Sequence, residues 1–500
     1  MSKKIVIERV ENLLILDSKF EEVLQPLLQF WEFKQYRGRE LFEYHAQQRA
    51  AGILRPKNFR NIRKKLYKIS QDKLVCPGNL ISRVYTNLVS NGYQVEYKDH
   101  RNLIIPEPDF SKVQLLRGDQ PDILAKISAR DCGIIDYPTG AGKSFLMGEI
   151  AAMYPQLPII VSCPTCAIFK TLIKYFAERG LCPGCCGDSK FDIENKRIII
   201  STVQSLPKLG KLLETVPLFL YDEAYTAASP KNAEHISMIK NARMFAFADK
   251  PFARNDGRNL IVESLFGPLI HTSTYQDAVE SGSVSQINVL LCNVSDKAKP
   301  QSLHNHRDDI NKRNCYWAND IRNKAIADSV DVGLNFLNLK LEDCQILIMV
   351  ETAEHALNLK HLLPNFTVCH SGNLDKDRKE IFSKRNFDKD SIELTPKELS
   401  EKQKAFEEGS LKHVIATKIW SAGVNFTKLQ IEIRGDALVS EVPNVQLPGR
   451  LARLGKPKLL IDFTDRFSEW SEKRADRRIS FYRKRGWPVS VHQELLPIRE

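Results

Sequence analysis

A glycine-rich segment that ends in lysine and serine is the clearest chemical motif of this sequence. The segment comprises Pro138, Thr139, Gly140, Ala141, Gly142, Lys143 and Ser144. An apolar strand-like run precedes it and an apolar helix-like run follows it, so backbone N–H groups and a helix N-terminus surround one concave site for phosphates. Lys143 can reach the β- and γ-phosphates, and the Ser144 hydroxyl can bind Mg²⁺. The alternative is a turn with a chance lysine, but both flanking elements favour a nucleotide site.

A pair of carboxylates, Asp222 and Glu223, follows the apolar run 217–221. Ligands bind at the ends of strands in open parallel sheets. One carboxylate, Asp222, can hold Mg²⁺ through water, while Glu223 can polarise an attacking water. Alone, such a pair most often marks a surface turn. Because it follows the phosphate loop in chain order, it predicts the second half of a nucleoside triphosphate hydrolysis site.

Short apolar strands alternate with helical segments in two successive sets, which predicts an α/β fold with two parallel sheets. The predicted organisation is a small basic α+β domain at 1–110, α/β domains at 111–290 and 316–465, a polar linker at 291–315 and a basic tail at 466–500.

Composition sets the broad class of the protein. The 500 residues include 73 Lys plus Arg and 61 Asp plus Glu, so the net charge is +12. A hydrophobic share of 43% is ordinary for a globular chain. No run reaches the roughly 18 apolar residues of a membrane helix, and charges interrupt the apolar N-terminal segment, unlike a secretory signal. We therefore expect a soluble, cytoplasmic protein with a polyanionic partner and no membrane partner.

Two basic stretches could contact that partner. The first combines Phe59 and Tyr67 with cations and no acidic residue, and its cations are Arg55, Lys57, Arg60, Arg63, Lys64, Lys65 and Lys68. The second lies at 474–485. A solvated helix face is one interpretation of the first stretch, and a phosphate-contacting surface is the other.

The eleven cysteines include two pairs with zinc-ribbon spacing, Cys163 with Cys166 and Cys182 with Cys185. The segment 167–180 between the pairs has the pattern of an amphipathic helix, about 21 Å long at 1.5 Å per residue. Pairs at opposite ends of such a helix cannot share one ion with bonds of about 2.3 Å. We therefore expect reduced structural thiols and no structural zinc.

The two nucleotide motifs resemble those of superfamily 2 helicases. Residues 138–144 resemble motif I, and Asp222-Glu223-Ala224-Tyr225 resembles the DEAD/DEAH box; the resemblance continues in order over 112–465. It implies two tandem RecA-like domains, ATP and Mg²⁺ as cofactors, and a nucleic-acid track. It also implies adenine contacts from Arg117 and Gln120, and strand contacts from Pro164, Thr165, Thr202, Gln204 and Thr417.

The second domain resembles the family in motifs V and VI. Gly423 stands in the motif V segment, which implies a role in coupling nucleotide to the strand. Gln446, Arg450 and Arg453 match motif VI. The two arginines are three residues apart, so a helix would present both on one side, where they suit the charge on a transferring γ-phosphoryl group. The alternative is a surface helix with two solvated arginines.

The sequence also departs from the family pattern. Tyr225 replaces the usual Asp or His, and the segment 247–251 lacks the hydroxyls of motif III, which in the family link the ATP site to movement of the nucleic-acid strand. Asp256-Gly257-Arg258 follows and is a candidate for part of that role. The overall layout resembles the group of UvsW-type phage helicases and XPB-like branch-migration helicases. This likeness implies branched DNA as substrate.

The sequence as a whole predicts an ATP-dependent DNA helicase or translocase that remodels forks, junctions or displaced strands in replication, recombination or repair. One alternative is an RNA helicase or a duplex translocase that does not unwind. Another is a nucleic-acid clamp that binds ATP with weak turnover. A restriction-type motor subunit would need a nuclease-like carboxylate–lysine cluster, and none stands out. Protein partners cannot be predicted.

Overall fold

The computed structural model describes residues 4–35, 38–50, 59–254, 256–304, 307–370, 394–417, 420, 426, 428–439 and 458–497. The chain divides into two compact units, residues 1–138 with 142–273 and residues 274–500 with the short segment 139–141, so the main division follows Ser273. The first unit contains the N-terminal domain and the first α/β domain, and the second contains the other α/β domain. This division lies earlier than the predicted boundary at 290.

The N-terminal domain is built on a five-stranded sheet with the order β5-β6-β2-β1-β7. Its strands are β1 (Lys4–Val10), β2 (Leu13–Asp17), β5 (Lys68–Ser70), β6 (Lys73–Pro77) and β7 (Gln94–Asp99). Alternate residues of β1 and β2 are buried, as expected for a sheet with one covered face. Helix α3 (Ile81–Ser90) supplies Val84 and Leu88 to the core between helix and sheet.

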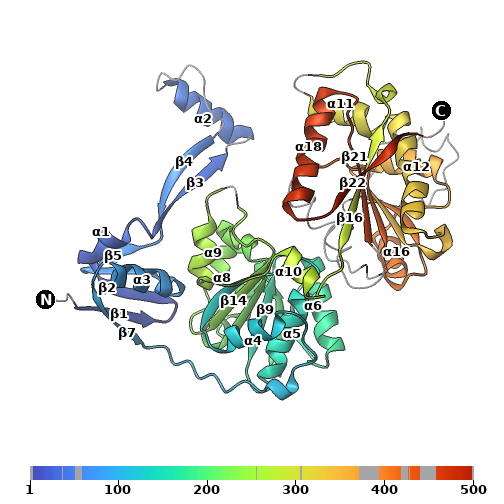
Figure 1. Ribbon diagram of the computed structural model, residues 1–500. Coiled ribbons are helices and arrows are strands. Elements are labelled where there is room, and N and C mark those ends of the chain that lie inside the picture. Colours follow the sequence, from blue (N-terminus) through green and yellow to red (C-terminus); the bar gives the residue numbers. More distant parts are fainter. Residues whose placement is uncertain are drawn as a thin grey trace. The chain divides into compact units, whose positions relative to one another are not determined.

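A separate two-stranded antiparallel ribbon extends from this domain. It consists of β3 (Gln29–Gln35) and β4 (Phe59–Lys65), and α2 (Gly38–Ala50) lies at its far end (Figure 1). The first basic stretch therefore lies largely on a strand, and the helix face considered from the sequence is not what the described residues form.

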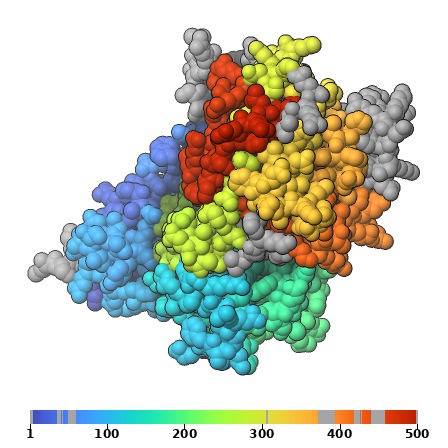
Figure 2. Space-filling view, turned by 45° about the vertical axis from the view of Figure 1, so that its right-hand side comes forward, coloured from blue at the N-terminus to red at the C-terminus, as the bar shows by residue number. Residues whose placement is uncertain are grey.

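The base of the N-terminal domain is joined to the first α/β domain by buried hydrogen bonds. Asn79, 3% exposed, accepts from Arg9 at 2.7 Å and donates to the carbonyl of Leu265 at 2.5 Å. Arg83 forms a two-pronged ion pair with Glu263, with N–O distances of 2.8 and 2.5 Å. Figure 2 shows the light-blue surface of the N-terminal domain next to the cyan and green surface of the α/β domain.

The first α/β domain has an eight-stranded sheet with the order β11-β10-β12-β9-β13-β14-β8-β15. Its strands are β8 (Cys132–Asp136), β9 (Ile159–Cys163), β10 (Gly184–Gly187), β11 (Lys190–Asp192), β12 (Ile198–Thr202), β13 (Leu218–Asp222), β14 (Arg243–Ala248) and β15 (Leu269–Thr272). The central strands are parallel and buried along their whole length, which explains their uninterrupted apolar sequences.

Helices connect these strands (Figure 1). They include α4 (Gln120–Ser128), α5 (Lys143–Met153), α6 (Cys166–Glu178), α7 (Leu212–Thr215), α8 (Pro230–Ile236) and α9 (Asn259–Phe266). Short 3-10 helices η4 (Val203–Leu209) and η5 (Ala224–Ala228) follow β12 and β13. The predicted helix between the cysteine pairs is α6, and none of the eleven cysteines, all of which lie in the described ranges, forms a disulfide bond.

The second unit has a seven-stranded sheet with the order β18-β19-β17-β20-β21-β16-β22. Its strands are β16 (Ile287–Val294), β17 (Ile346–Val350), β18 (Thr367–Cys369), β19 (His413–Thr417), β20 (Ile431–Arg434), β21 (Lys458–Phe463) and β22 (Val489–Leu496). Strand β16 pairs with β21 and β22, so it belongs to this domain although the sequence analysis divided it between domain 1 and the linker. The predicted basic tail likewise contributes a strand, β22.

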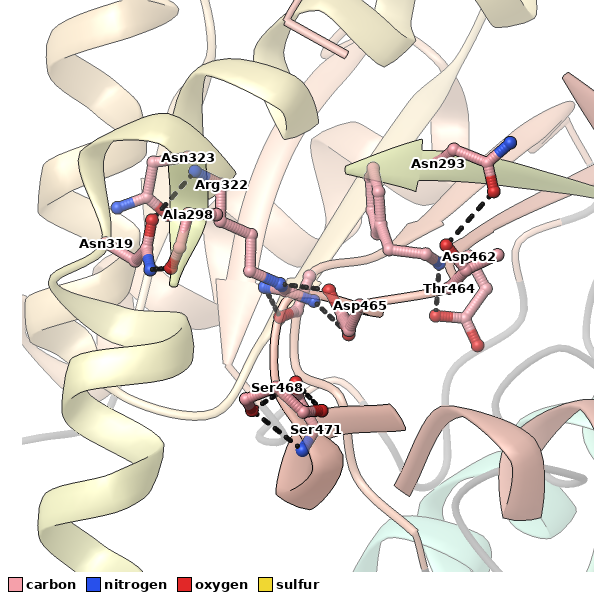
Figure 3. A network of polar contacts seen from close by, with 12 residues as sticks. Asn293, Ala298, Asn319, Arg322, Asn323, Asp462, Thr464, Asp465, Ser468 and Ser471 are labelled. Atoms are coloured by element: carbon pink, nitrogen blue, oxygen red, sulfur yellow. Dashed lines mark hydrogen bonds and ion pairs between the residues drawn. The ribbon is translucent and has the colours of Figure 1, made fainter. Parts of the chain in front are cut away.

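Helices of the second unit include α10 (Tyr275–Glu280), α11 (Asp308–Lys312), α12 (Asp320–Leu337), α13 (Ala353–Leu362), α16 (Pro396–Glu408) and α18 (Glu469–Lys484). A buried ion network ties α12 and α18 to the loop after β21. Arg322 bonds Asp465 at 2.8 Å (Figure 3), and Arg478 bonds Asp462 at 2.9 Å and Asp465 at 3.0 Å. Arg478 is fully buried, so this member of the second basic stretch is structural.

Candidate nucleotide site

The glycine-rich segment connects β8 to α5, as the sequence predicts. Gly140 and Gly142 have φ values of 90° and 104°, in the left-handed region that favours glycine. Helix α5 begins at Lys143, and the Lys143 ammonium donates to the carbonyl of Tyr137 at 3.3 Å. The loop and the first turn of α5 therefore have the geometry of a phosphate-binding turn.

Gln120 lies beside this loop. It is 4% exposed, and its side-chain oxygen accepts from the backbone N–H of Arg117 at 2.9 Å. Its side-chain nitrogen lies 3.1 Å from the position that a Cβ on Gly142 would take. The structure thus brings Gln120 and the phosphate loop together, while the Arg117 side chain is exposed.

The two carboxylates lie at the end of β13, where Asp222 is the last residue of the strand and Glu223 follows it. Asp222 is 5% exposed and accepts from the backbone N–H of Glu223 at 3.0 Å. Burial raises the pKa of both carboxyl groups, that of Glu223 to about 7, and the charge of Lys143 opposes both shifts. Lys143 therefore acts electrostatically on the acidic pair. A carboxylate with a pKa near neutral pH accepts a proton more readily than an ordinary glutamate, which suits a general base.

Glu223 also has an unusual backbone. Its φ of 61° and ψ of 58° are left-handed, a conformation that is uncommon for residues other than glycine. The Glu223 carbonyl accepts from both the backbone N–H and the hydroxyl of Thr226, at 2.9 and 2.8 Å. The orientation of Glu223 is therefore tied to the first turn of η5.

A polar cluster that the sequence analysis did not identify supports the site from behind. The buried Tyr137 donates to Asp119 at 2.9 Å, and His271 lies 2.8 Å from the other oxygen of Asp119. Asp119 directly precedes Gln120, so the cluster fixes the start of α4 against the residue that opens the glycine-rich turn. The sequence signal for this cluster was Tyr137, which stands where the general phosphate-loop pattern begins with glycine. Its partners could not be predicted, because they are 18 or more residues away.

The residues of this domain that were predicted to contact a nucleic-acid strand lie at the ends of two adjacent β-strands, β9 and β12. Pro164 and Thr165 follow β9, and Gln204 donates to the carbonyl of Pro164 at 3.2 Å. Thr165 caps α6 by accepting from Ile168 N–H at 3.3 Å. Thr202 ends β12, but its buried hydroxyl donates to Ser205 at 3.0 Å. Thr165 and Gln204 are exposed, whereas the Thr202 side chain is not.

The remaining predicted residues divide into two groups. Thr417 ends β19 and is 6% exposed. Others lie outside the described residues, and these are Arg55, Lys57, Gly423, Gln446, Arg450 and Arg453.

Four described cations of the first basic stretch, Arg60, Arg63, Lys64 and Lys65, lie exposed on β4, and Lys68 lies exposed on β5. Strand β3 adds aromatic groups that the sequence analysis missed. Trp31, 61% exposed, is the register partner of Arg63, and Phe33, 39% exposed, is that of Asn61. Antiparallel partners share a face of a ribbon, so this face combines aromatic rings with positive charge.

Within the described ranges, no helix is long and apolar enough to cross a membrane, and no group of three or more His, Cys, Asp or Glu could hold a metal ion. Ser144 and Asp222 offer the hard oxygen ligands that Mg²⁺ prefers when a nucleotide supplies the others.

Comparison with known proteins supports the assignment made from the motifs. Residues 114–251 match the family model described as "Type III restriction enzyme, res subunit". No curated protein sequence matches this chain. The matched segment contains both the glycine-rich loop and the Asp222-Glu223 pair, the two motifs on which the resemblance to superfamily 2 helicases rests.

Solved structures show the fold. The chain is similar to Dbp5 of S. cerevisiae bound to RNA and ADP BeF3, with 13% identity, coverage of 76% of this chain and 91% of that chain, and a TM-score of 0.50. T4 UvsW matches over 98% of this chain and 99% of that chain, with 16% identity and a TM-score of 0.41. The predicted tandem RecA-like α/β architecture is confirmed.

Proposed function

We propose that this protein is an ATP-dependent DNA helicase or translocase that remodels branched DNA. The observation that carries the proposal is the convergence of Lys143, Asp222 and Glu223 at one edge of the first sheet, beside Gln120. A phosphate-binding lysine, a magnesium-binding carboxylate and a base with a raised pKa are the parts that hydrolysis of a nucleoside triphosphate needs.

Each residue has a proposed task. The loop amides and Lys143 hold the phosphates, and Gln120, with Arg117, contacts the adenine. Ser144 and Asp222 hold Mg²⁺, which when bound neutralises charge on the β- and γ-phosphates. Glu223 orients the attacking water and accepts its proton.

The second domain completes the proposed machinery. Arg450 and Arg453 would stabilise the charge on the γ-phosphoryl group, with Gln446 and Gly423 near the same nucleotide. Supplying these groups from a second domain would make hydrolysis depend on closure of the two domains.

The nucleic-acid track is proposed from exposed groups. Thr165, Gln204 and Pro164 lie together at one sheet edge, and Thr202 and Thr417 would act through their backbone groups. The ribbon adds Arg60, Arg63, Lys64 and Lys65, and its aromatic residues suit stacking on unpaired bases. The preceding Arg55 and Lys57 would extend the same charge. Affinity should fall steeply with salt, because phosphate neutralisation dominates it.

A side-by-side ATPase assay tests the substrate. We expect forked DNA to stimulate hydrolysis more than single-stranded DNA, and both more than RNA. Stimulation by RNA alone would replace the DNA proposal with an RNA helicase. Stimulation without strand separation would identify a duplex translocase, and stoichiometric ATP binding without turnover would identify a clamp.

A further inference from the structure

The loop before α9 contacts the ribbon of the N-terminal domain. The backbone N–H of Phe33 donates to the carbonyl of Asp256 at 2.9 Å. Gly257 has a φ of 78°, and a Cβ placed on it would lie 1.9 Å from the carbonyl oxygen of Trp31. Any residue other than glycine would push the ribbon away, so this close approach is built into the sequence.

An ion pair reinforces the contact. The Glu32 carboxylate bonds the guanidinium of Arg258, and the Lys64 ammonium lies 3.6 Å from the other carboxylate oxygen. Glu32 is 9% exposed, although it lies on a two-stranded ribbon. A charged pair that is largely removed from water is less screened than an exposed pair.

The same loop holds the helix that follows Glu223. Arg258 donates to the carbonyl of Ala228 at 3.3 Å, and Arg254 donates to the carbonyl of Tyr225 at 2.7 Å. Arg254 is itself bonded to Asp256. Both ends of η5 are therefore connected to the loop that contacts the ribbon, and the first turn of η5 holds the Glu223 carbonyl.

The two faces of the ribbon have different partners. Glu32 points to the loop, while its strand neighbours Trp31 and Phe33 lie on the opposite face with Arg63 and Asn61. The face that combines aromatic rings with Arg63 and Lys65 is thus the reverse of the face bonded to Arg258, whereas Arg60 and Lys64 lie on the Glu32 face. A ligand that moves the ribbon would therefore change the geometry of the Glu32–Arg258 ion pair.

We propose that Glu32, Arg254 and Arg258 are positioning residues, through which nucleic acid bound to the ribbon affects the orientation of Glu223. The inference rests on the proposed function. The segment 247–251 lacks the hydroxyl side chains that link the ATP site to strand movement in the family that the sequence resembles. The proposal assigns this link to the contact between the ribbon and the loop before α9. Coupling through packed and hydrogen-bonded groups of this kind needs direct measurement.

Two matched pairs of variants test the connection. Gly257→Ala adds a methyl group that meets the ribbon, whereas Gly180→Ala, at a φ of 79°, adds one in open space. Glu32→Gln removes the charge facing Arg258, whereas Glu22→Gln removes an exposed charge from the same domain. The readouts are the ratio of ATPase rates with and without forked DNA, the KM for ATP, and thermal unfolding.

We expect Gly257→Ala and Glu32→Gln to lower the stimulation of the ATPase rate by forked DNA about fivefold or more. The change should be in kcat, with little change in the KM for ATP. The two controls should behave like wild type, and Arg258→Lys should retain more stimulation than Arg258→Gln. If wild type hydrolyses ATP no faster than Lys143→Ala, the proposed function fails. If wild type is stimulated but both test variants match their controls, the connection fails and the function stands.

Hydrogen exchange on the wild-type protein makes the test independent of variant folding. Forked DNA should alter exchange of the Phe33 and Thr226 amides together, because one chain of contacts joins them. A change at Phe33 without any change at Thr226 would overturn the connection.

Discussion

The two α/β domains each place carboxylates after a parallel strand, yet the carboxylates have opposite surroundings. In the first domain, burial raises the pKa of Asp222 and Glu223 at the end of β13. In the second, burial also acts to raise the pKa of Asp462 in β21, but Arg478, Arg434 and Tyr482 together outweigh burial and lower the pKa. Glu223 and Asp465 even share a left-handed backbone, with φ values of 61° and 45°.

The difference lies in where the positive charge comes from. Arg322 and Arg478, on α12 and α18, form ion pairs with the second-domain carboxylates and join the helices to the sheet. Figure 3 shows the pair of Arg322 with Asp465. The first-domain pair is influenced by Lys143 on the phosphate loop and remains suited to an additional cation. One site therefore stabilises the fold, and the other is suited to binding and hydrolysis.

The largest expected effect comes from a substitution in the candidate nucleotide site of the first α/β domain. Lys143→Ala should lower the ATPase rate by about 10²–10³-fold, the range for loss of one group that stabilises transition-state charge. Because the Lys143 side chain is partly exposed, the free energy of unfolding should change little. Steady-state ATPase and urea denaturation measure the two quantities, and a large loss of stability with normal ATPase would reverse the assignment.

Arg478→Met should have the opposite pattern. Loss of one partner from a buried ion network costs about 3–5 kcal/mol of unfolding free energy, because buried carboxylates lose their counter-charge. Denaturant unfolding of the second domain measures this cost. Arg477→Met is the control, since Arg477 is exposed and next in sequence. Equal stability of the two variants would contradict the structural role of Arg478.

The pH dependence of stability sharpens the contrast. Glu223 has a pKa of about 7 in the folded chain against 4.5 as its ordinary value. The folded state thus binds this proton more tightly, and the stability that protonation provides is present below pH 4.5 and lost as the pH rises through 7. Glu223→Gln should therefore raise the melting temperature by a few degrees at pH 8 but not at pH 4, without Mg²⁺ or nucleotide. An unchanged difference across this range would contradict the raised pKa.

The smallest expected effect compares two kinds of arginine. Arg63→Ala on the exposed ribbon should weaken DNA binding a few-fold and reduce the salt slope by about 1, as for one phosphate contact. Its effect on unfolding should be small, unlike that of Arg478→Met. Fluorescence anisotropy over a salt series is the measurement, with Lys73→Ala on the five-stranded sheet as control. A loss equal to that of the control would remove the ribbon from the interface.

The sequence alone was sufficient to locate the parts of the candidate site that are local. The glycine-rich loop and the Asp222-Glu223 pair each occupy a few adjacent residues, and the strands around them are continuous apolar runs. Glu32 and Arg258 could not be paired in this way, because 226 residues separate them and the pairing depends on how the ribbon meets the loop.

The second basic stretch shows a signal that was present but not used. Ser471, Ala475, Ile479 and Tyr482 are buried at helical spacing on α18, and Arg478 falls on the same face. The position of Arg478 on this apolar face indicates a buried arginine, whereas the number of charged residues in the stretch indicates a solvated one. The β-strand of the first stretch had no such signal, since its cations do not alternate regularly with apolar residues.

The most direct test of the central claim is steady-state ATP hydrolysis by wild type and Glu223→Gln, each with Mg²⁺ and forked DNA. If the edge of the first sheet is a hydrolysis site with Glu223 as base, wild type is stimulated by the DNA and the variant loses about 10²-fold or more of that rate. The variant should still bind ATP. Equal rates for the two proteins would contradict the account.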